Sequence, residues 1–451
     1  MLRFTVITAI SLWLAAGTSL RGQTTPLAKP EDLGLRIPVG KTPFEVQDRS
    51  VVVPADGDMW TDPVVAKVYL EVGSHYIVVM PDGALRSIQK RQTTETDRPF
   101  ESLTKDELAE QLEKQFPGFK TRATRRYLCV YNTDNSFCER KSKILETMYP
   151  MLVSYFKRQK LKPVNPDTPL VVVMFRTKEQ FQRYREGMPD SMLAYYNSVN
   201  NRVFMYQYSD ISKDAPMIAA KQSTSTIAHE GVHQILHNIG VQKRLSSWPL
   251  WLSEGVAEYF APTSVGVRSK WSGVGRPNEL RMRDLFIYLK EQNRIGDGAI
   301  LNRVVTAEKL TSTDYAIAWA LVHYLTTKHK DEFFDYLRDV SSGLPLEPPE
   351  EEIVRFMEYF GTDLRTLERE MITHVRSLPY TDPVANQFYY VVTLKAGSKK
   401  YATVTSSLDH DKVRRDLLQK VPARDRAKAV FNFGKYRNQR SAVIAMKQYL
   451  N

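Results

Sequence analysis

Cysteine is scarce in this sequence, and long apolar runs are absent after its first residues. Of 451 residues only two are cysteines, and they do not form a C-x-x-C pair, which argues against a thiolate zinc site. No later stretch is long and apolar enough to form a transmembrane helix, and no tandem repeat is evident. We therefore expect a globular mature protein without membrane-spanning segments and without thiolate metal chemistry.

Positive charge is in modest excess. Lys and Arg number 63 against 51 Asp and Glu, which gives a formal net charge of +12. Without Arg3 and Arg21, which fall in the expected leader, the balance is 61 against 51, or +10. The basic residues are scattered among acidic ones, and no tract resembles a nucleic-acid-binding motif. The charge could steer acidic partners, but we expect no nucleic-acid partner.

The first 22 residues have the composition of a secretory signal peptide. Arg3 supplies a positive charge, and the run FTVITAISLWLAAG that follows has the apolar character of a signal core. Small residues that offer cleavage points are Ala15, Gly17, Ser19 and Gly22. The run is shorter than the ~20 residues that span a bilayer, which disfavours an uncleaved anchor. We expect export to the periplasm or the extracellular space, with no stable membrane insertion after cleavage.

Export would place Cys129 and Cys138 in an oxidising compartment. The residues DNS between them are typical of a turn that could bring the two chain segments together. The sequence therefore favours a Cys129–Cys138 disulfide, and a pair of buried thiols is the alternative.

Residues 23–118 form an expected N-terminal β-rich region. Its first part, 24–50, is rich in Pro, Thr and Gly and predicts an extended leader, whereas 64–92 is typical of a strand meander. In the segment 103–116, Thr104 is followed three residues later by Glu107, which predicts an amphipathic helix that begins with a capping box.

Residues 119–380 form the expected catalytic domain. A strand at 125–133, a long helix and a strand at 169–175 suggest a βαβ-like unit. A helix at 177–186 and a third strand at 200–208 follow, and the chain is then mostly helical to about residue 380.

The C-terminal region, 381–451, predicts a hairpin at 388–404 and basic amphipathic helices over 408–450. With the regions before it, this organisation indicates the α+β class. The fold we expect is a mixed sheet whose edge strand lies above a central helix, followed by a mostly helical subdomain.

The run AHEGVHQILHNIG contains the pattern H-E-x-x-H at His229, Glu230 and His233. The predicted helix could begin at any of the capping residues 223–226, and Gly240 is a natural stop. Two histidines one turn apart on a helix can direct their imidazoles at one ion, with the glutamate close enough to reach a water on that ion. The pattern can also arise by chance, so a third ligand is needed to make a metal site.

Glu254 is the candidate for that third ligand. It lies 21 residues after His233 in WPLWLSEGVAEYF, where Ser247 and Pro249 predict the start of a second helix. Glu258 lies one turn further along the same helix. One carboxylate would ligate the ion, and the other could accept an N–H from a ligating histidine. The alternative, a solvated pair of glutamates, is weakened by the aromatic and aliphatic residues around them.

The strings HEGVH, LSEG and YAIAWALVHYL resemble the gluzincin pattern of zinc peptidases, including the M1 aminopeptidase and leukotriene A4 hydrolase branch. They are more similar to an exported bacterial family of uncharacterised proteins, DUF1570, over roughly residues 120–330. The resemblance implies Zn²⁺ held by His229, His233 and Glu254, with Glu230 as the general base. It also implies an oxyanion-stabilising role for Tyr315 and a supporting carboxylate at Glu258.

The sequence departs from the family pattern in two places. The G-x-M-E-N string that grips a free amino terminus in the aminopeptidases is absent, so an endopeptidase is favoured over an exopeptidase. The tyrosine motif keeps Tyr315 but lacks the Lys and Gly of Y-E-K-G.

Gly231, inside the active helix, suggests close packing there. His237 lies too far along the helix to share the ion, and a packed or hydrogen-bonded role is favoured.

The function that the sequence predicts is that of an exported zinc metallopeptidase. The resemblance implies a peptide or protein substrate that binds in extended form along the strand at 200–206. Two alternatives stay open: a metallohydrolase of a non-peptide substrate, and an exported binding or scaffold protein with an inert metal site.

Overall fold

The computed structural model describes residues 35–450, apart from 39, 47, 58, 185–191, 209–215, 265–269, 293, 348–350, 384–387, 406–409 and 438. The expected signal peptide at 1–22 and the first part of the expected leader lie outside these residues. The chain divides into two compact units. Of the described residues, the main unit comprises those within 35–208 and 223–380, and the C-terminal unit comprises those within 381–450 together with 216–222.

The architecture is mixed α+β with open sheets, as the sequence predicts. In the part of the chain that the structure describes, no helix has the length and apolar character needed to cross a membrane.

An antiparallel sheet of six strands opens the main unit, with the order β5-β4-β3-β2-β6 and β1 paired to β3. Its strands are β1 (Pro43–Glu45), β2 (Ser50–Val53), β3 (Val64–Val72), β4 (His75–Val79), β5 (Leu85–Gln89) and β6 (Thr94–Thr96). The meander predicted over 64–92 is confirmed as β3, β4 and β5. Alternate residues of β3 are buried, as expected for a strand with one face on a core.

A second sheet has the order β10-β11-β9-β8-β7. Its strands are β7 (Lys120–Ala123), β8 (Tyr127–Tyr131), β9 (Leu170–Thr177), β10 (Ala194–Asn197) and β11 (Arg202–Tyr208). Strand β9 pairs in parallel with β8 and with β11. Helix α2 (Asn135–Arg158) connects β8 to β9, so the predicted βαβ unit is confirmed.

The edge of this sheet is not the strand that the sequence indicates. The predicted edge at 200–206 is β11, which pairs with β9 on one side and with β10 on the other. Among the described strands, β10 is the edge on this side of the sheet and β7 is the edge on the other. The sequence could not reveal this because β10 is only four residues long, and strand order depends on contacts that are distant along the chain.

Helices cover both faces of the second sheet. On one face, Val203 and Met205 join the core formed with α2 and the following helices. On the other face, Phe204 and Tyr206 pack with α1 (Lys105–Gln115) and α3 (Lys178–Tyr184). The alternation of side chains along β11 therefore places one set in each core. Thr104 and Glu107 form the predicted capping box of α1.

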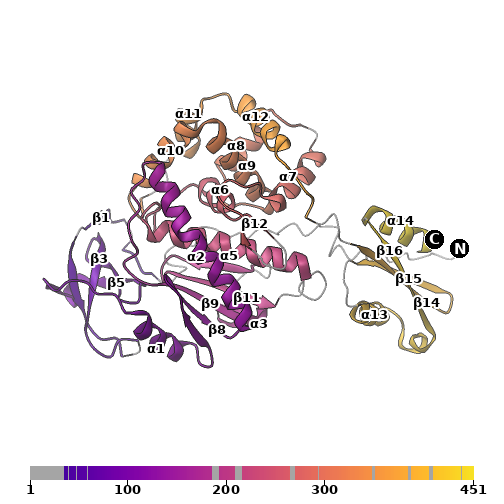
Figure 1. The fold of residues 1–451 in the computed structure, drawn as a ribbon, viewed down its shortest axis with the longest axis horizontal. Coiled ribbons are helices and arrows are strands. Elements are labelled where there is room, and N and C mark those ends of the chain that lie inside the picture. Colours follow the sequence, from indigo (N-terminus) through magenta and orange to yellow (C-terminus); the bar gives the residue numbers. More distant parts are fainter. Residues whose placement is uncertain are drawn as a thin grey trace. The chain divides into compact units, whose positions relative to one another are not determined.

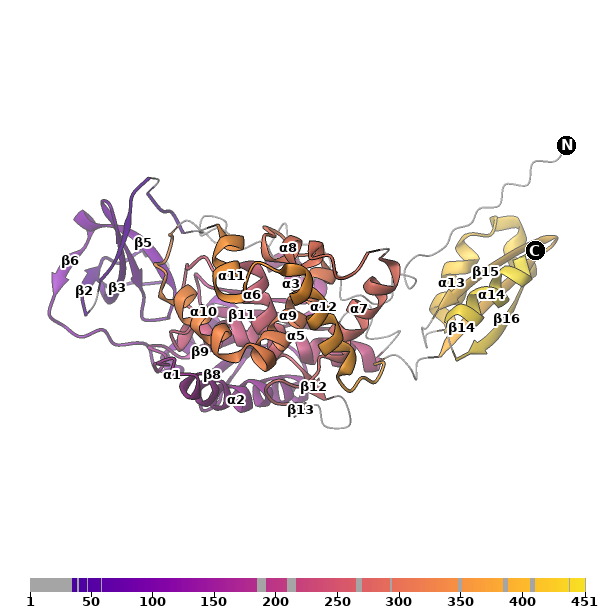
Figure 2. The same cartoon turned by 90° about the horizontal axis from the view of Figure 1, so that it is seen from above.

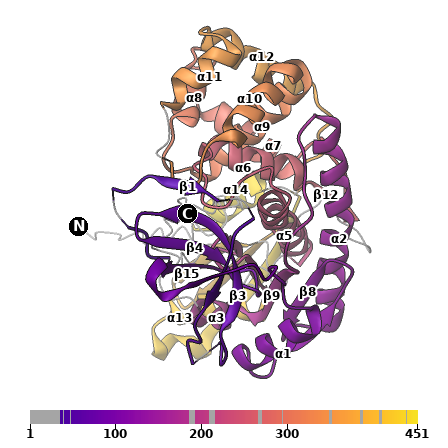
Figure 3. The same ribbon diagram turned by 90° about the vertical axis from the view of Figure 1, so that its left-hand side faces the viewer.

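The remainder of the main unit is mostly helical, and Figures 1 and 3 show these helices gathered on one side of the sheets. The helices are α5 (Pro216–Asn238), α6 (Leu250–Phe260), α7 (Glu279–Glu291), α8 (Ala299–Val305), α9 (Ser312–Lys328), α10 (Lys330–Ser342), α11 (Glu352–Phe360) and α12 (Leu364–Ser377). Two short strands, β12 (Thr263–Ser264) and β13 (Lys270–Trp271), lie between α6 and α7.

Only the C-terminal boundary of α5 agrees with the boundary predicted from the sequence. The helix ends at Asn238, and Gly240 has φ +73°, so the predicted glycine stop is confirmed. The helix begins at Pro216, before the predicted caps at 223–226. Those residues lie inside the helix, and a tertiary contact uses the side chain of one of them. Thr224 is buried and accepts a hydrogen bond from Lys141 Nζ of α2 at 2.9 Å.

Cys129 and Cys138 are both free and buried, so the predicted disulfide is corrected to a contact between two thiols. Cys129 lies in β8 and Cys138 in α2, and the residues expected to form a turn between them begin α2 instead. The two thiols hydrogen-bond to each other, and this bond, with burial, raises the pKa of Cys129 well above its ordinary value. The same hydrogen bond is the main cause of a lowered pKa of Cys138.

The C-terminal unit contains a three-stranded antiparallel sheet with the order β15-β14-β16. Its elements are β14 (Tyr389–Ala396), β15 (Lys399–Thr405), α13 (His410–Gln419), β16 (Ala429–Tyr436) and α14 (Gln439–Leu450), which Figure 2 shows together. The predicted hairpin at 388–404 is confirmed as β14 and β15. The prediction of helices alone over 408–450 is wrong, because β16 lies between α13 and α14 and completes the sheet.

Candidate metal centre

Helix α5 supplies the two histidines of the H-E-x-x-H pattern. Gln234, on the same helix, donates to the carbonyl oxygens of Val171 and Asn201 at 3.0 and 2.9 Å, which ties α5 to β9 and to the chain just before β11. His229 and His233 lie one turn apart and their rings meet at 4.9 Å between centroids. The helix is therefore held against the sheet while both imidazoles point toward α6.

Helix α6 supplies Glu254, and a glycine makes its position possible. All eleven residues of α6 are buried. A Cβ at Gly255 would lie 2.7 Å from the carbonyl oxygen of Ala318 in α9, a separation that real side chains do not tolerate. The glycine lets the two backbones approach closely and places the neighbouring Glu254 beside α5. Pro249, rather than the predicted Ser247, occupies the N-cap position.

A second glycine, Gly231, lies between the two histidines on α5. A Cβ at this position would lie 2.3 Å from Leu145 Cδ2 of α2. The close packing that the sequence suggests at Gly231 is confirmed, and it is α2 that makes the approach.

Three donor atoms converge in the centre. The Nε2 atom of His229 lies 3.0 Å from Glu254 Oε2 and 3.2 Å from His233 Nε2, and the latter lies 3.6 Å from Glu254 Oε2. Two atoms that each lie about 2.0–2.1 Å from a tetrahedral zinc ion are about 3.3 Å apart. The three separations bracket that value. Among the described residues, this group is the one in which at least three His, Cys, Asp or Glu donors could hold an ion.

The centre is buried and its charges are coupled. His229 is 3% exposed and Glu254 is 8% exposed. Burial acts to lower the pKa of His229, but the carboxylates of Glu258 and Glu254 outweigh it and raise the pKa to about 10. Burial acts to raise the pKa of Glu254, yet His233 and His229 hold that pKa far below its ordinary value. The carboxylates therefore keep negative charge in a place that favours a cation.

Glu258 supports His229 from the opposite side of the ring. Its Oε1 atom lies 3.1 Å from His229 Nδ1. The same oxygen accepts a hydrogen bond from Arg281 at 2.5 Å, and Oε2 accepts one from Asn278 Nδ2 at 2.9 Å. Burial acts to raise the pKa of Glu258, but Arg281 and His229 hold it at about 2. An anionic carboxylate at Nδ1 orients the imidazole so that Nε2 faces Glu254 and His233.

Glu230 is buried next to the three donors. Its Oε2 atom accepts a hydrogen bond from the backbone N–H of Tyr196, in β10, at 2.8 Å. Burial raises the pKa of Glu230, although the charges of His229 and His233 oppose the shift. A carboxyl group with a raised pKa exchanges a proton more readily near neutral pH.

Tyr315, on α9, is 1% exposed and lies against the centre. Its ring centroid is 6.1 Å from that of His229, and the guanidinium of Arg281 lies 5.1 Å from the same tyrosine ring. Burial raises the pKa of Tyr315 well above its ordinary value, so the hydroxyl keeps its proton.

His237 and His323 stand apart from the donor group. The ring of His237 stacks on that of Tyr196 at 5.5 Å, and burial lowers its pKa to about 3, in agreement with the packed role that the sequence favours. His323, on α9, lies 2.9 Å from His374 Nε2 through its Nδ1 atom.

Sequence reasoning missed three contributors to this centre. Arg281 and Asn278 come from the start of α7, and Tyr196 contributes through its backbone N–H. No motif marks the two α7 residues, and a backbone contact depends on no particular side chain. The one signal in the sequence is the pair of polar residues three positions apart in NELR.

Residues 223–347 match the DUF1570 domain, which is described as a protein of unknown function. The domain begins within α5 and includes the three donors, Glu230, Glu258 and Tyr315. It does not include β8 to β11, which the resemblance noted in the sequence also covered. No curated protein matches the chain.

Proposed function

We propose that this protein is an exported zinc-dependent peptidase in which Glu230 is the general base. The observation that carries the proposal is the convergence of His229, His233 and Glu254 within 3.6 Å of one another, next to a buried Glu230. A structural zinc site has no need for such a carboxylate, since four protein ligands usually close it.

The donor set suits Zn²⁺, because two imidazoles and one carboxylate leave a fourth position open. A bound zinc ion would supply Lewis acidity and would lower the pKa of a coordinated water toward about 7. His229, His233 and Glu254 would hold the ion. Glu258 and Arg281 would keep the imidazole of His229 in its ligating orientation.

Glu230 would take a proton from the attacking water and pass it to the leaving amine. Two features suit it to this role. The hydrogen bond from Tyr196 fixes one carboxylate oxygen, and burial raises its pKa toward the working pH. Tyr315 would donate a hydrogen bond to the developing oxyanion, for which a protonated phenol is required.

The substrate would bind beside β10 rather than beside β11. In an antiparallel strand, the N–H and C=O of one residue point to the same side. Since the Tyr196 N–H reaches Glu230, that side of Tyr196 faces away from β11. No described strand pairs with β10 on that side, and a peptide that extends along it would pass the general base.

The test is hydrolysis of a fluorogenic peptide library by the zinc-loaded protein, with and without a chelator. We expect cleavage that a chelator abolishes and that zinc restores. Glu230→Gln should lower kcat by about 10²–10⁴-fold while the protein still binds one zinc ion. Glu146→Gln, which changes a carboxylate on α2 outside the centre, is the matched control and should keep full activity. Zinc binding without hydrolysis of any peptide would refute the peptidase proposal in favour of a non-peptide hydrolase or an inert scaffold.

A further inference from the structure

Residues 381–451, which form most of the C-terminal unit, carry most of the excess positive charge of the protein. Residues 381–451 contain 14 Lys and Arg against 5 Asp and Glu, a net charge of +9, whereas the rest of the chain has 49 against 46. The basic residues are therefore not scattered evenly, as whole-chain composition suggests. One short segment is strongly basic and the remainder is nearly neutral.

These cations are exposed and mostly lack carboxylate partners. Every Lys and Arg side chain of 381–451 that the structure describes is exposed, and Lys412 is the one that it does not describe. Within those described residues, only Arg414 and Arg424 lie within 4 Å of a carboxylate, at 3.8 and 3.9 Å. Uncompensated surface charge at this density creates a potential that attracts anions.

Three lysines gather at one end of the sheet. Lys395 of β14 lies directly opposite Lys400 of β15, and Lys399 is paired with Ala396 at the same hairpin. Val430 of β16 is paired with Lys395 on its other side and is 61% exposed. Like charges placed directly opposite one another destabilise a sheet. We call Lys395, Lys399, Lys400 and Val430 the hairpin patch. Lys395, Lys400 and Val430 share one face of the sheet, whereas Lys399, next to the turn, lies on the other face.

The two helices lie on opposite faces of the sheet. On one face, Leu394 and Phe431 pack with α13. Lys395 and Lys400 point to the other face, where Lys400 Nζ lies 5.6 Å from the ring of Tyr449 in α14. The C-terminal end of α14, including the 40% exposed Leu450, therefore lies beside the hairpin patch.

Exposed apolar side chains accompany the cations in this unit. Those with the largest exposed fractions are Val430 (61%), Ile444 (48%), Phe388 (41%), Leu450 (40%) and Phe433 (36%). Of these, Val430 and Leu450 lie beside the lysines of the hairpin patch. Cations next to exposed aliphatic groups are typical of proteins that lie on anionic membranes, because charge attracts the headgroups and apolar groups enter the interface.

From these observations we infer that the C-terminal unit binds the surface of an anionic phospholipid membrane through the hairpin patch. A nucleic acid is the other large polyanion to weigh. It would stack its bases on open aromatic faces, but Lys435 Nζ lies 3.7 Å from the centre of the Phe388 ring and Arg414 lies over Phe433. The most exposed apolar group, Val430, has no ring to stack. Binding is peripheral, and it concentrates the main unit at the membrane.

The test is co-sedimentation of the expected mature chain, 23–451, with phosphatidylcholine vesicles that contain or lack phosphatidylglycerol. We expect binding only to the anionic vesicles. Binding should weaken as the salt concentration rises from about 0.1 M to about 1 M, because the Debye length falls from ~10 Å to ~3 Å. Equal binding to neutral vesicles would overturn the inference.

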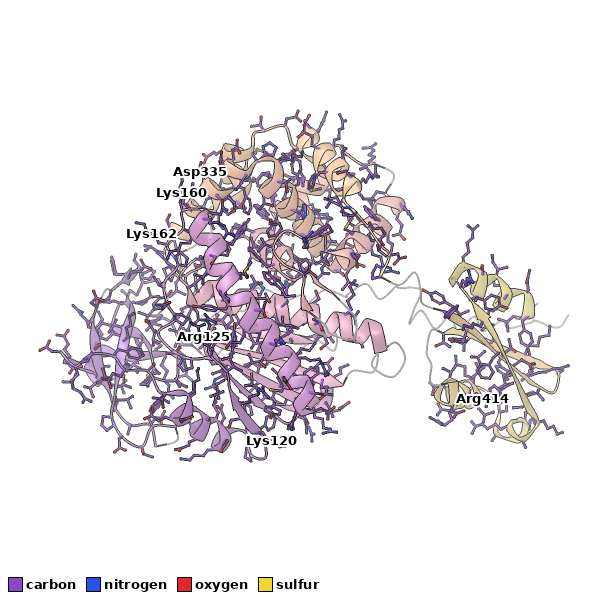
Figure 4. The ribbon with its side chains drawn as sticks, viewed as in Figure 1. Lys120, Arg125, Lys160, Lys162, Asp335 and Arg414 are labelled. Carbon is purple, nitrogen blue, oxygen red and sulfur yellow. The ribbon has the colours of Figure 1, made fainter. Side chains whose placement is uncertain are left out.

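Charge-reversal variants locate the surface. The triple variant Lys395→Glu, Lys399→Glu and Lys400→Glu should weaken binding to anionic vesicles by roughly a hundredfold or more. The control reverses three exposed lysines of the main unit, Lys120, Lys160 and Lys162, which Figure 4 labels. This control makes the same change in net charge and should reduce binding far less. An equal reduction would show that total charge, not the hairpin patch, governs binding.

Two further measurements separate lipid from other partners. Val430→Ser should weaken vesicle binding severalfold, whereas Val164→Ser, at a position of similar exposure (58%) in the main unit, should have no effect. A single-stranded RNA oligonucleotide should bind more weakly than the anionic vesicles at the same salt concentration. Tighter RNA binding, lost in the hairpin variant, would overturn the lipid assignment in favour of a nucleic-acid surface. Circular dichroism and zinc binding should be unchanged in all variants.

Discussion

The main unit contains two pairs of histidines whose rings are in contact, and only one pair has the surroundings of a metal centre. His229 and His233 bring two Nε2 atoms to 3.2 Å, and His323 and His374 bring two nitrogens to 2.9 Å. The first pair is flanked by the carboxylates of Glu254 and Glu258. His323 instead contacts the carbonyl oxygen of Gly275, at 3.3 Å, and the rings of Tyr259 and Trp319.

The carboxylates reverse the effect of burial on the two pairs. Burial, with a smaller contribution from nearby His374, lowers the pKa of His323 to about 4. In the other pair, Glu258 and Glu254 overcome burial and raise the pKa of His229 to about 10. Burial alone produces neutral core histidines, whereas burial with anionic neighbours produces a site for positive charge. The carboxylates, rather than the proximity of two histidines, therefore identify the centre.

The largest expected difference between the two pairs is in zinc affinity. His233→Asn removes one of three donors and should weaken zinc binding by more than the 10–100-fold typical of an indirect partner. His323→Asn should leave the affinity unchanged. Competition with a chromophoric chelator measures both constants. If His233→Asn retained the affinity of the parent protein, the proposed ligand set would be wrong.

The pH dependence of stability should have opposite signs for the two pairs in the metal-free protein. The folded pKa of His323, about 4, lies below its unfolded value. Between these values the unfolded chain binds a proton that the folded chain does not, so stability decreases as pH falls, by roughly 3 kcal/mol from pH 7 to pH 4. His229, with its raised pKa of about 10, stabilises the fold at low pH and loses this contribution as pH rises through 10.

Urea unfolding at several pH values checks these signs. His323→Asn should lose less stability between pH 7 and pH 4 than the parent protein does. An unchanged acid dependence in this variant would show that other groups dominate, and would contradict the assignment of a neutral buried His323.

A moderate loss of zinc affinity is expected when Glu258 is changed, because its carboxylate contacts His229 but is not itself a proposed zinc ligand. Glu258→Gln should weaken zinc binding by about 10–100-fold, since a neutral amide no longer favours the orientation of His229 in which Nε2 faces the ion. Glu368→Gln is the matched control. Glu368 is also fully buried, but it accepts backbone N–H groups of Gly296, Ile300 and Leu301, so its variant should lose stability and keep zinc affinity. Calorimetric titration with zinc separates the two outcomes.

The smallest loss of zinc affinity is expected when Arg281 is changed, because it contacts Glu258 rather than a proposed zinc ligand. Arg281→Lys keeps a positive charge near Glu258 but loses the planar group that also lies over Tyr315. We expect a loss of zinc affinity of less than about tenfold. Arg283→Lys, two residues away on α7, should have no effect. A larger effect of Arg281→Lys than of Glu258→Gln would contradict a role that acts through Glu258.

The parts of the site that could be predicted are those that depend on local periodicity. The spacing of His229 and His233 places both on one side of any helix, whatever the helix packs against. Glu254 and Glu258 follow the same rule on α6, and the resemblance to zinc peptidases added the link between the two helices. The capping box of α1 and the glycine stop of α5 were also predictable, because each needs only residues that are adjacent in the chain.

Other features were decided by contacts that no short segment contains. The edge position of β10 depends on strand order, and the free thiols depend on how β8 and α2 meet. Thr224 lies inside α5 rather than at its start, and Lys141 of α2 binds its hydroxyl. Arg281 enters the centre from α7, 23 residues after the carboxylate of Glu258 that it contacts.

The amino-acid sequence by itself determined the helical faces, the capping residues and the kinds of donor available for a metal ion. Tertiary structure alone decided which of the histidines meet carboxylates, which strand is left at the edge of the sheet and which lysines gather at one end of a sheet. The reason is physical: backbone geometry sets side-chain direction within an element, whereas distance and burial between elements arise only when the whole chain packs.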